Sequence, residues 1–69
     1  MIEVFKTNVQ HEEDAQILVK KLTEHFPHYK INFDLMDSDN ILRVEGEYLR
    51  PQSIINYMHN WSYQCHVLD

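Results

Sequence analysis

Residues 30–47, which read KINFDLMDSDNILRVEGE, decide the fold. Apolar and polar side chains alternate over 30–35, the period-two pattern of a strand with one buried face. Turn-forming Asp, Ser and Asn residues fill 37–40, and the alternation resumes over 41–47. The segment therefore predicts a β-hairpin.

The chain before this hairpin predicts a strand and then a helix. Residues 2–7 alternate with a period of two. Over 10–26 the apolar side chains recur three and four residues apart, as in an amphipathic helix: they are Ala15, Leu18, Val19, Leu22 and Phe26. Pro27 is expected to end this helix.

The chain after the hairpin repeats that pattern in reverse order. Pro51 suits the first position of a helix, and a second apolar stripe follows, formed by Ile54, Ile55, Met58 and Trp61. Residues 63–68 are expected to form the last strand. The predicted order is strand, helix, strand, strand, helix, strand.

This order predicts an α+β fold, a ferredoxin-like βαββαβ sandwich over a single domain, residues 1–69. Two interleaved strand-helix-strand units would form a four-stranded antiparallel sheet with both helices on one face. The expected core packs the helices on one sheet face, through Leu18, Leu22, Ile54, Met58, Val4, Ile31, Phe33, Val44 and Val67. The open face is expected to carry Asn32, Asp34, Arg43 and Glu45.

Composition and charge limit the function classes. The chain has 69 residues, a formal net charge of −5 and six scattered Lys and Arg residues. Nucleic acid is not an expected partner, because a phosphate backbone is bound mainly through clustered cations. No stretch approaches the ~20 apolar residues of a membrane span, so membrane insertion is not expected. The single cysteine, Cys65, favours a reducing compartment, and the expected localisation is cytoplasmic.

Four segments together resemble the heavy-metal-associated (HMA) domains of copper chaperones, and the resemblance covers nearly the whole chain. The segments are Phe26-Pro27-His28-Tyr29, Ile31-Asn32-Phe33-Asp34-Leu35, Leu42-Arg43-Val44-Glu45-Gly46 and Ser62-Tyr63. They are similar to the turn, the second strand, the third strand and the Gly-Tyr pair of that family. The resemblance implies the ferredoxin-like fold.

The segment of this chain that corresponds to the metal loop of the family lacks the two cysteines of that loop. Counting back from Leu18 and Leu22 places His11 and Asp14 where the family has its two cysteines. A shift in the loop places Asn8 and His11 there instead. Cu(I) prefers thiolate ligands, so copper transfer is not expected here.

The predicted topology gathers three connections at one end of the sheet: strand 1 to helix 1, the hairpin turn, and helix 2 to strand 4. His11 and Asp14 lie three residues apart at a helix start and share a face, and His59 comes from the helix 2 connection. These three residues are the candidate metal ligands. The candidate cofactor is a divalent ion such as Zn²⁺, Ni²⁺ or Co²⁺, which suits nitrogen and oxygen ligands better than Cu(I) does.

The remaining chemistry-bearing residues favour structural roles. His25 and His28 flank Pro27 and are expected to be solvated, His66 is expected to face outward, and Cys65 is expected to pack as a small apolar residue. Trp61 is expected in the core. Aromatic surface is expected from Phe5, Tyr57 and Tyr63.

Three functional hypotheses follow. The first is a small non-catalytic binding or interaction domain of HMA type with an altered metal loop, acting through a protein partner or as a homodimer paired at a sheet edge. The second is the divalent-metal module that uses His11 and Asp14. The third is a small-molecule regulatory domain of the ACT type. An enzyme is not expected, because Gly46 is the only glycine and no phosphate loop or nucleophile motif occurs.

Overall fold

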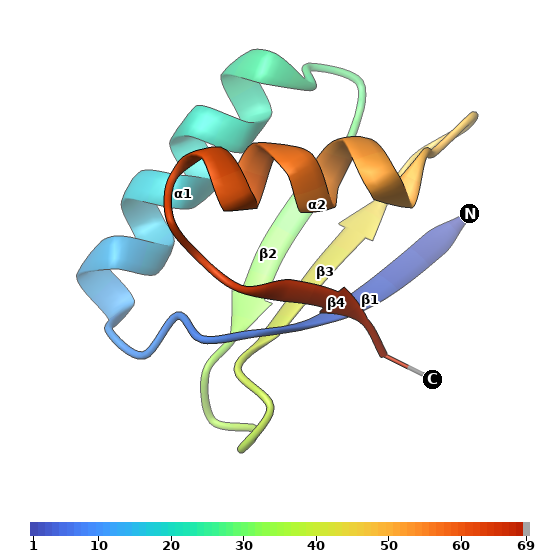
Figure 1. The fold of residues 1–69 in the computed structure, drawn as a ribbon. Helices are drawn as coiled ribbons and strands as arrows, with labels where there is room; N and C mark the ends of the chain where they lie inside the picture. The colour runs from blue at the N-terminus through green and yellow to red at the C-terminus, as the bar shows by residue number, and fades with distance from the viewer. Residues whose placement is uncertain (69) are drawn as a thin grey trace.

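Two helices and a four-stranded sheet make up the computed structural model, which describes residues 1–68 and leaves Asp69, the last residue of the predicted domain, outside the described part. All paired strands are antiparallel, and the strand order is β2-β3-β1-β4 (Figure 1). The predicted α+β class and four-stranded antiparallel sheet are confirmed. The elements in chain order are β1 (Ile2–Thr7), α1 (Glu12–His25), β2 (Lys30–Asp34), β3 (Ile41–Glu45), α2 (Pro51–Asn60) and β4 (Cys65–Val67).

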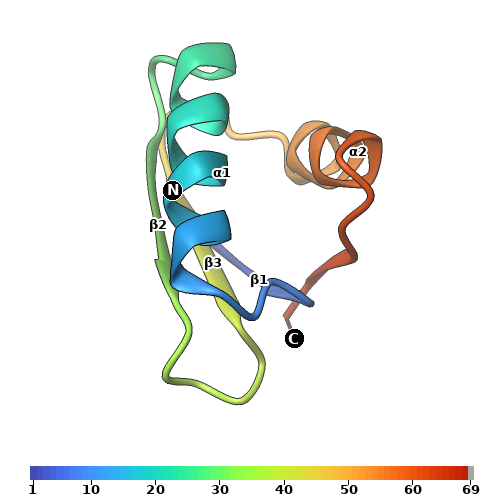
Figure 2. The same cartoon turned by 90° about the vertical axis from the view of Figure 1, so that its left-hand side faces the viewer.

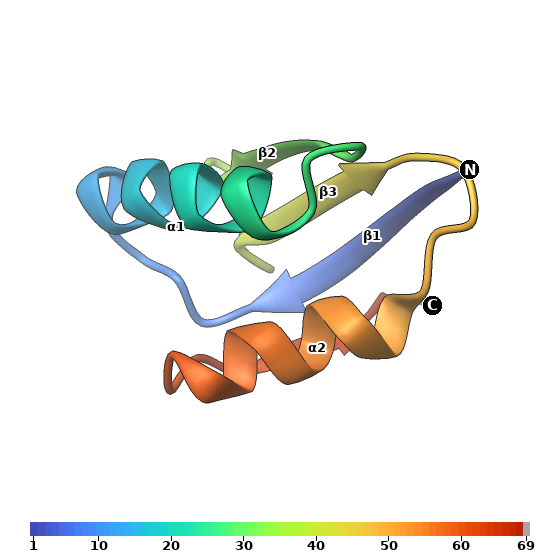
Figure 3. The ribbon, with the colours of Figure 1, turned by 90° about the horizontal axis from the view of Figure 1, so that it is seen from above.

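The strand register defines the buried face of the sheet. Leu42 lies opposite both Phe5 and Phe33, and Phe5 also lies opposite Val67, so these side chains share one face. Buried residues of both helices join the same apolar cluster. Figures 2 and 3 show α1 running along β2 while α2 lies across β1 and β4. The helices therefore cover one face through Ala15, Leu18, Leu22, Ile54 and Met58.

The core predicted between the sheet and the helices is confirmed except for Val4 in β1. Val4 lies opposite Arg43 on the open face, while Phe5 is completely buried. The prediction that Val4 is a core residue is wrong, and so is the expectation that Phe5 is exposed. Both alternating sets of β1 contain apolar residues, and burying Phe removes more apolar surface from water than burying Val. The polar residues predicted for the open face are exposed, as expected: Asn32, Asp34, Arg43 and Glu45.

The helix ends follow the local chemistry. The first turn of α1 is acidic, which suits the positive end of the helix dipole. The helix ends at His25, and the backbone N–H of Phe26 donates to the carbonyl of Leu22 just before Pro27. Pro51 occupies the start of α2, as predicted. The predicted helix over 10–26 is therefore confirmed over 12–25.

Trp61 lies outside the core, which corrects the prediction. Helix α2 ends at Asn60, so Trp61 follows the last turn and the buried stripe stops at Met58. The Trp61 side chain is 45% exposed. The Nζ atom of Lys21 lies 4.1 Å from its ring centroid, a cation–π contact that partly covers the indole.

Within residues 1–68, no helix combines the length and the apolar character that crossing a membrane would require.

Candidate functional site

The three predicted connections do meet at one end of the sheet, called the His11 end here (residues 8–11, 35–40 and 61–64). The hydroxyl of Thr7 donates to the carbonyl of Asn40 at 2.6 Å, which joins the end of β1 to the hairpin turn. The backbone N–H of Gln64 donates to Oδ1 of Asn8 at 2.8 Å, which joins the α2–β4 connection to the β1–α1 connection. The expected gathering of connections is confirmed.

The candidate metal ligands lie at separate points of this end. His11 is exposed at the N-cap of α1 and makes no side-chain capping bond; Asp14 is half-buried in the first turn; His59 is exposed in the last turn of α2. Across residues 1–68, no three His, Cys, Asp or Glu side chains are grouped so that they could hold a metal ion. The structure does not assemble the predicted three-ligand set, and binding through His11 and Asp14 alone stays a prediction.

Most other polar side chains at the His11 end form hydrogen bonds with nearby backbone groups. Oδ1 of Asp34 accepts from the N–H of Met36 at 3.1 Å, and Oδ1 of Asp37 accepts from the N–H of Asp39 at 2.9 Å. Asp39 also lies 3.7 Å from the Lys6 ammonium. These contacts are turn geometry and one exposed ion pair.

Cys65 lies opposite Thr7 at this end, on β4. Its side chain is completely buried in the apolar cluster, as expected. Burial raises the pKa of this thiol from 9.0 to about 12, because the thiolate would lose its hydration. Cys65 is a poor nucleophile in the folded protein. His66, the next residue, is exposed as predicted.

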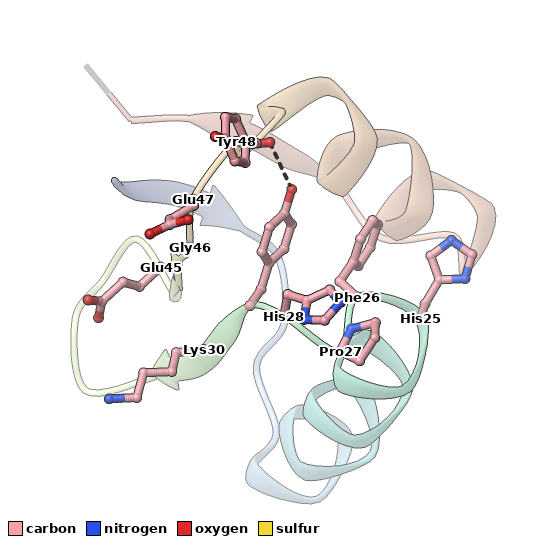
Figure 4. A pocket seen from close by; sticks show the side chains of 10 residues that line it. His25, Phe26, Pro27, His28, Lys30, Glu45, Gly46, Glu47 and Tyr48 are labelled. Atoms are coloured by element: carbon pink, nitrogen blue, oxygen red, sulfur yellow. Dashed lines mark hydrogen bonds between the residues drawn. The ribbon is translucent and has the colours of Figure 1, made fainter.

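A hollow of the surface lies at the opposite end, between the α1–β2 connection and the end of β3. It is an open groove of about 720 Å³, called the Tyr48 groove here. Figure 4 shows Glu45, Glu47 and Tyr48 on one side of it and the residues from the end of α1 on the other. Its lining residues are His25, Phe26, Pro27, His28, Tyr29, Lys30, Glu45, Gly46, Glu47 and Tyr48.

Aromatic rings form one wall of the Tyr48 groove. The rings of Phe26 and Tyr29 are stacked with centroids 5.4 Å apart and an interplanar angle of 12°. The centroid of the His25 ring lies 4.7 Å from that of Phe26, in an edge-on contact, and 4.7 Å from that of Tyr57 in α2. Such pairs hold each ring in place beyond the effect of burial alone. The wall is therefore preformed.

Gly46 allows the groove to close against β3. A Cβ atom added at Gly46 would lie 2.5 Å from Cδ1 of Tyr29, well inside van der Waals contact. The absence of a side chain lets the Tyr29 ring lie against the backbone at the end of β3. The Tyr29 hydroxyl then donates to the carbonyl of Tyr48 at 3.4 Å, the dashed line in Figure 4. The only glycine of the chain is explained by this close approach.

Tyr48 has an unfavourable backbone conformation and an unburied side chain. Its φ of 54° lies in the left-handed region, which costs a residue with a Cβ atom roughly 1–2 kcal/mol. The residue is 89% exposed and gains almost no burial in return. The next residue, Leu49, is 5% exposed and anchors the connection in the core. The fold thus holds a large aromatic side chain out at the rim of the groove.

No ion pair within 4.0 Å joins Lys30 to Glu45 or Glu47 in the groove. Lys30, Glu45 and Glu47 are all exposed. Among residues 1–68 the one ion pair within 4.0 Å joins Lys6 and Asp39. Lys30 lies directly opposite Glu45 in the sheet register, whereas Glu47 lies beyond the end of β3 and has no register partner.

A second groove adjoins the first and is lined by residues of α2. It has a volume of about 520 Å³ and shares His25 and Phe26 with the Tyr48 groove. Tyr57 and Trp61 contribute aromatic surface to it, and the Tyr57 hydroxyl donates to the carbonyl of Lys21 at 3.3 Å, which ties α2 to α1. The aromatic surface therefore extends over both helices.

Sequence reasoning missed this end of the molecule. His25 and His28 are exposed, as predicted, but they also line a groove, which the sequence did not show. Nothing in the local pattern indicates a left-handed Tyr48. The one available signal is the lone glycine two residues earlier, since an isolated Gly near a strand end often marks a close approach of another group.

No protein-family model, no curated protein and no solved structure matches this chain. The resemblance to HMA domains accordingly stays a prediction from the four sequence segments.

Proposed function

We propose that this protein is a small non-catalytic binding domain of ferredoxin-like, HMA-type fold, and that it binds an extended segment of a partner protein in the Tyr48 groove. The observation that carries the proposal is the conformation of Tyr48. A ring that is 89% exposed on a left-handed backbone contributes little to folding. Unfavourable backbone conformations with no structural return are concentrated at functional sites.

The shape of the groove favours a peptide segment over a small molecule. Small-molecule sites enclose their ligands and bury roughly 70–90% of the ligand surface. The Tyr48 groove is open and continues into the second groove through His25 and Phe26. A ligand that crosses both hollows needs the length of a polypeptide.

The composition of the groove favours a protein partner. Tyr and Trp are enriched among the residues that carry most binding energy in protein interfaces, and the surrounding rim is usually polar. Here Tyr29, Tyr48 and Phe26 line the groove together with Lys30 and the two glutamates. The stacked pair of Phe26 and Tyr29 is ordered before binding, which lowers the entropy cost of association.

The ferredoxin-like assignment is supported by the strand order together with the single layer of two helices. In that fold two strand-helix-strand units interleave, so that the first and third strands become the central pair. The order β2-β3-β1-β4 has this arrangement. The proposed binding surface lies at the opposite end from the loop that resembles the metal loop of the HMA family, so the function would be separate from metal transfer.

The proposal can be tested by selecting random peptides from a display library on the folded chain. Selection should enrich a related set of peptides that shift the amide resonances of residues 25–30 and 45–48 in NMR spectra. Tyr48→Ala should weaken their binding by roughly tenfold or more, the effect expected when an aromatic anchor is removed. Met36→Ala is the matched control, because Met36 is 97% exposed on the hairpin at the other end.

Three results would contradict the proposal. The first is a selection that enriches no peptide, and the second is a set of peptides that binds Tyr48→Ala as tightly as wild type. The third is a set of resonance shifts confined to the His11 end. Shifts at His11 and Asp14 on addition of zinc, or shifts on addition of free amino acids, combined with no peptide binding, would favour the metal or the ACT-type hypothesis instead.

A further inference from the structure

We infer that the segment bound in the Tyr48 groove carries an arginine, whose guanidinium group stacks on the exposed ring of Tyr48 and pairs with the carboxylate of Glu47. This inference rests on the proposed function and names the chemistry of the partner. It depends on the charge of the groove, on its aromatic faces and on a contact that the protein already makes with itself.

The charge of the groove favours a cation. The groove contains one lysine and two glutamates. Lys30 and Glu45 face each other across β2 and β3, so their charges offset locally. Glu47 lies beyond the end of β3, beside Tyr48 (Figure 4), and among residues 1–68 it forms no ion pair within 4.0 Å. The formal net charge of −5 would also attract a basic segment over a longer range.

The aromatic faces of the groove can accept that cation. An aromatic ring attracts a positive charge placed over its face, and the attraction increases as water is excluded. The Tyr48 ring is exposed and lies next in sequence to Glu47. A planar guanidinium can stack on such a ring and still direct a pair of N–H groups at a carboxylate, which an ammonium group cannot do. Arginine is therefore the expected side chain.

The neighbouring groove contains an intramolecular example of the same contact. The Nζ atom of Lys21 lies 4.1 Å from the centroid of the Trp61 ring, which lines the second groove. This ring already has its cation. The Tyr48 ring is the exposed aromatic ring in the first groove that a cation from outside the chain could cover.

The direct test uses two small probes of similar shape, the positively charged acetyl-arginine methylamide and the neutral acetyl-citrulline methylamide. Each is titrated into the folded chain while amide resonances are recorded by NMR. The arginine probe should shift residues 47 and 48 and bind roughly fivefold or more tightly than the citrulline probe, because it adds a cation–π contact and an ion pair. Glu47→Gln should remove most of this difference, and Glu13→Gln, an exposed carboxylate in the first turn of α1, should leave it intact.

The inference would be overturned by equal shifts with the two probes, by no shift at residues 47 and 48 with the arginine probe, or by an unchanged preference in Glu47→Gln. The peptide selection separates this failure from failure of the proposed function. Enriched peptides that lack basic residues but still require Tyr48 would overturn the arginine inference and leave the binding function in place. A selection that enriches no peptide overturns both.

Discussion

The two ends of the sheet use their distinctive residues in different ways. At the His11 end, the side chains that could do chemistry mostly complete the local structure: Thr7 bonds Asn40, Asn8 bonds Gln64 and Asp37 closes its own turn. At the Tyr48 end, the distinctive side chains are aromatic rings stacked around an open groove. A cluster of ionisable residues is therefore weaker support for a site than a group of side chains that folding alone does not explain.

Backbone conformation shows the same difference. Within residues 1–68, three residues other than glycine have positive φ values: Asn40, Tyr48 and Ser62. Asn40 and Ser62 lie in turns at the His11 end, where a short polar side chain can bond to nearby backbone groups. Tyr48 has neither a short side chain nor any burial, which distinguishes its end as the one where a residue is held against its local preference.

The largest expected effect is on the rate at which the Cys65 thiol is alkylated. Its pKa of about 12 lowers the thiolate fraction in mildly alkaline buffer by roughly 10³ relative to an ordinary thiol. Alkylation by iodoacetamide should therefore be roughly a hundredfold or more slower in the folded chain than in urea. The folded state keeps this proton longer than the unfolded chain, so the free energy of unfolding should fall as pH rises from about 9 toward 12. Equal labelling rates with and without urea would indicate a reactive thiol at the His11 end.

Replacing Thr7 tests whether the His11 end is structural. The Thr7 hydroxyl donates to the Asn40 carbonyl and accepts from the N–H of Val9 at 3.2 Å. Thr7→Val keeps the shape but leaves both groups without a partner, and should lower the free energy of unfolding by about 3 kcal/mol in urea titrations. Thr7→Ser keeps the hydroxyl and should lower the free energy of unfolding by only about 1 kcal/mol, for the lost methyl group. If the Thr7→Val chain is as stable as the wild-type chain, the hydrogen bonds of the Thr7 hydroxyl do not hold this end together.

Replacing Gly46 tests the packing of the Tyr48 end. Gly46→Ala places a Cβ atom 2.5 Å from Cδ1 of Tyr29, so the ring must move. We expect a loss of about 2 kcal/mol in the free energy of unfolding. In a double-mutant cycle, Tyr29→Ala should remove most of the cost of Gly46→Ala, because the clash partner is gone. Additive effects would show that the two residues are not in contact.

Replacing Tyr48 has the smallest expected effect on stability, with the opposite sign. Tyr48→Gly relieves the left-handed backbone at the expense of a more flexible unfolded chain, and should raise the free energy of unfolding by up to about 1 kcal/mol. Asn40→Gly, the matched change at the His11 end, should raise the free energy of unfolding very little, because Asn tolerates the left-handed conformation. The Tyr48→Gly chain should also lose peptide binding. A chain destabilised by Tyr48→Gly would mean that the ring serves folding after all.

Most of the secondary structure could be predicted because its signals are local. The alternation over 30–35, the turn residues over 37–40 and the helical stripes of α1 and α2 each specify an element within one segment. The buried face of β1 could not be predicted, because both of its alternating sets contain apolar residues and the choice depends on how Phe5 packs in the core. The prediction that Trp61 lies in the core was wrong for a related reason, since the periodicity did not show that α2 ends one residue before it.

The candidate site depended on contacts between distant segments. The sequence correctly indicated that the connections of the His11 end meet, because that follows from element order. It could not indicate that Tyr29 packs on Gly46, seventeen positions further along the chain, or that the Tyr29 hydroxyl bonds the Tyr48 carbonyl. These contacts create the groove.

Local patterning was thus enough to establish two amphipathic helices, four strands and a shared core, because each depends on the period of apolar residues within one segment. Folding in three dimensions alone selected the buried face of β1, left the metal candidates without a three-ligand group and brought the aromatic residues together around Gly46. The physical reason is that burial and close approach are properties of pairs of segments, and a single segment does not encode its neighbour.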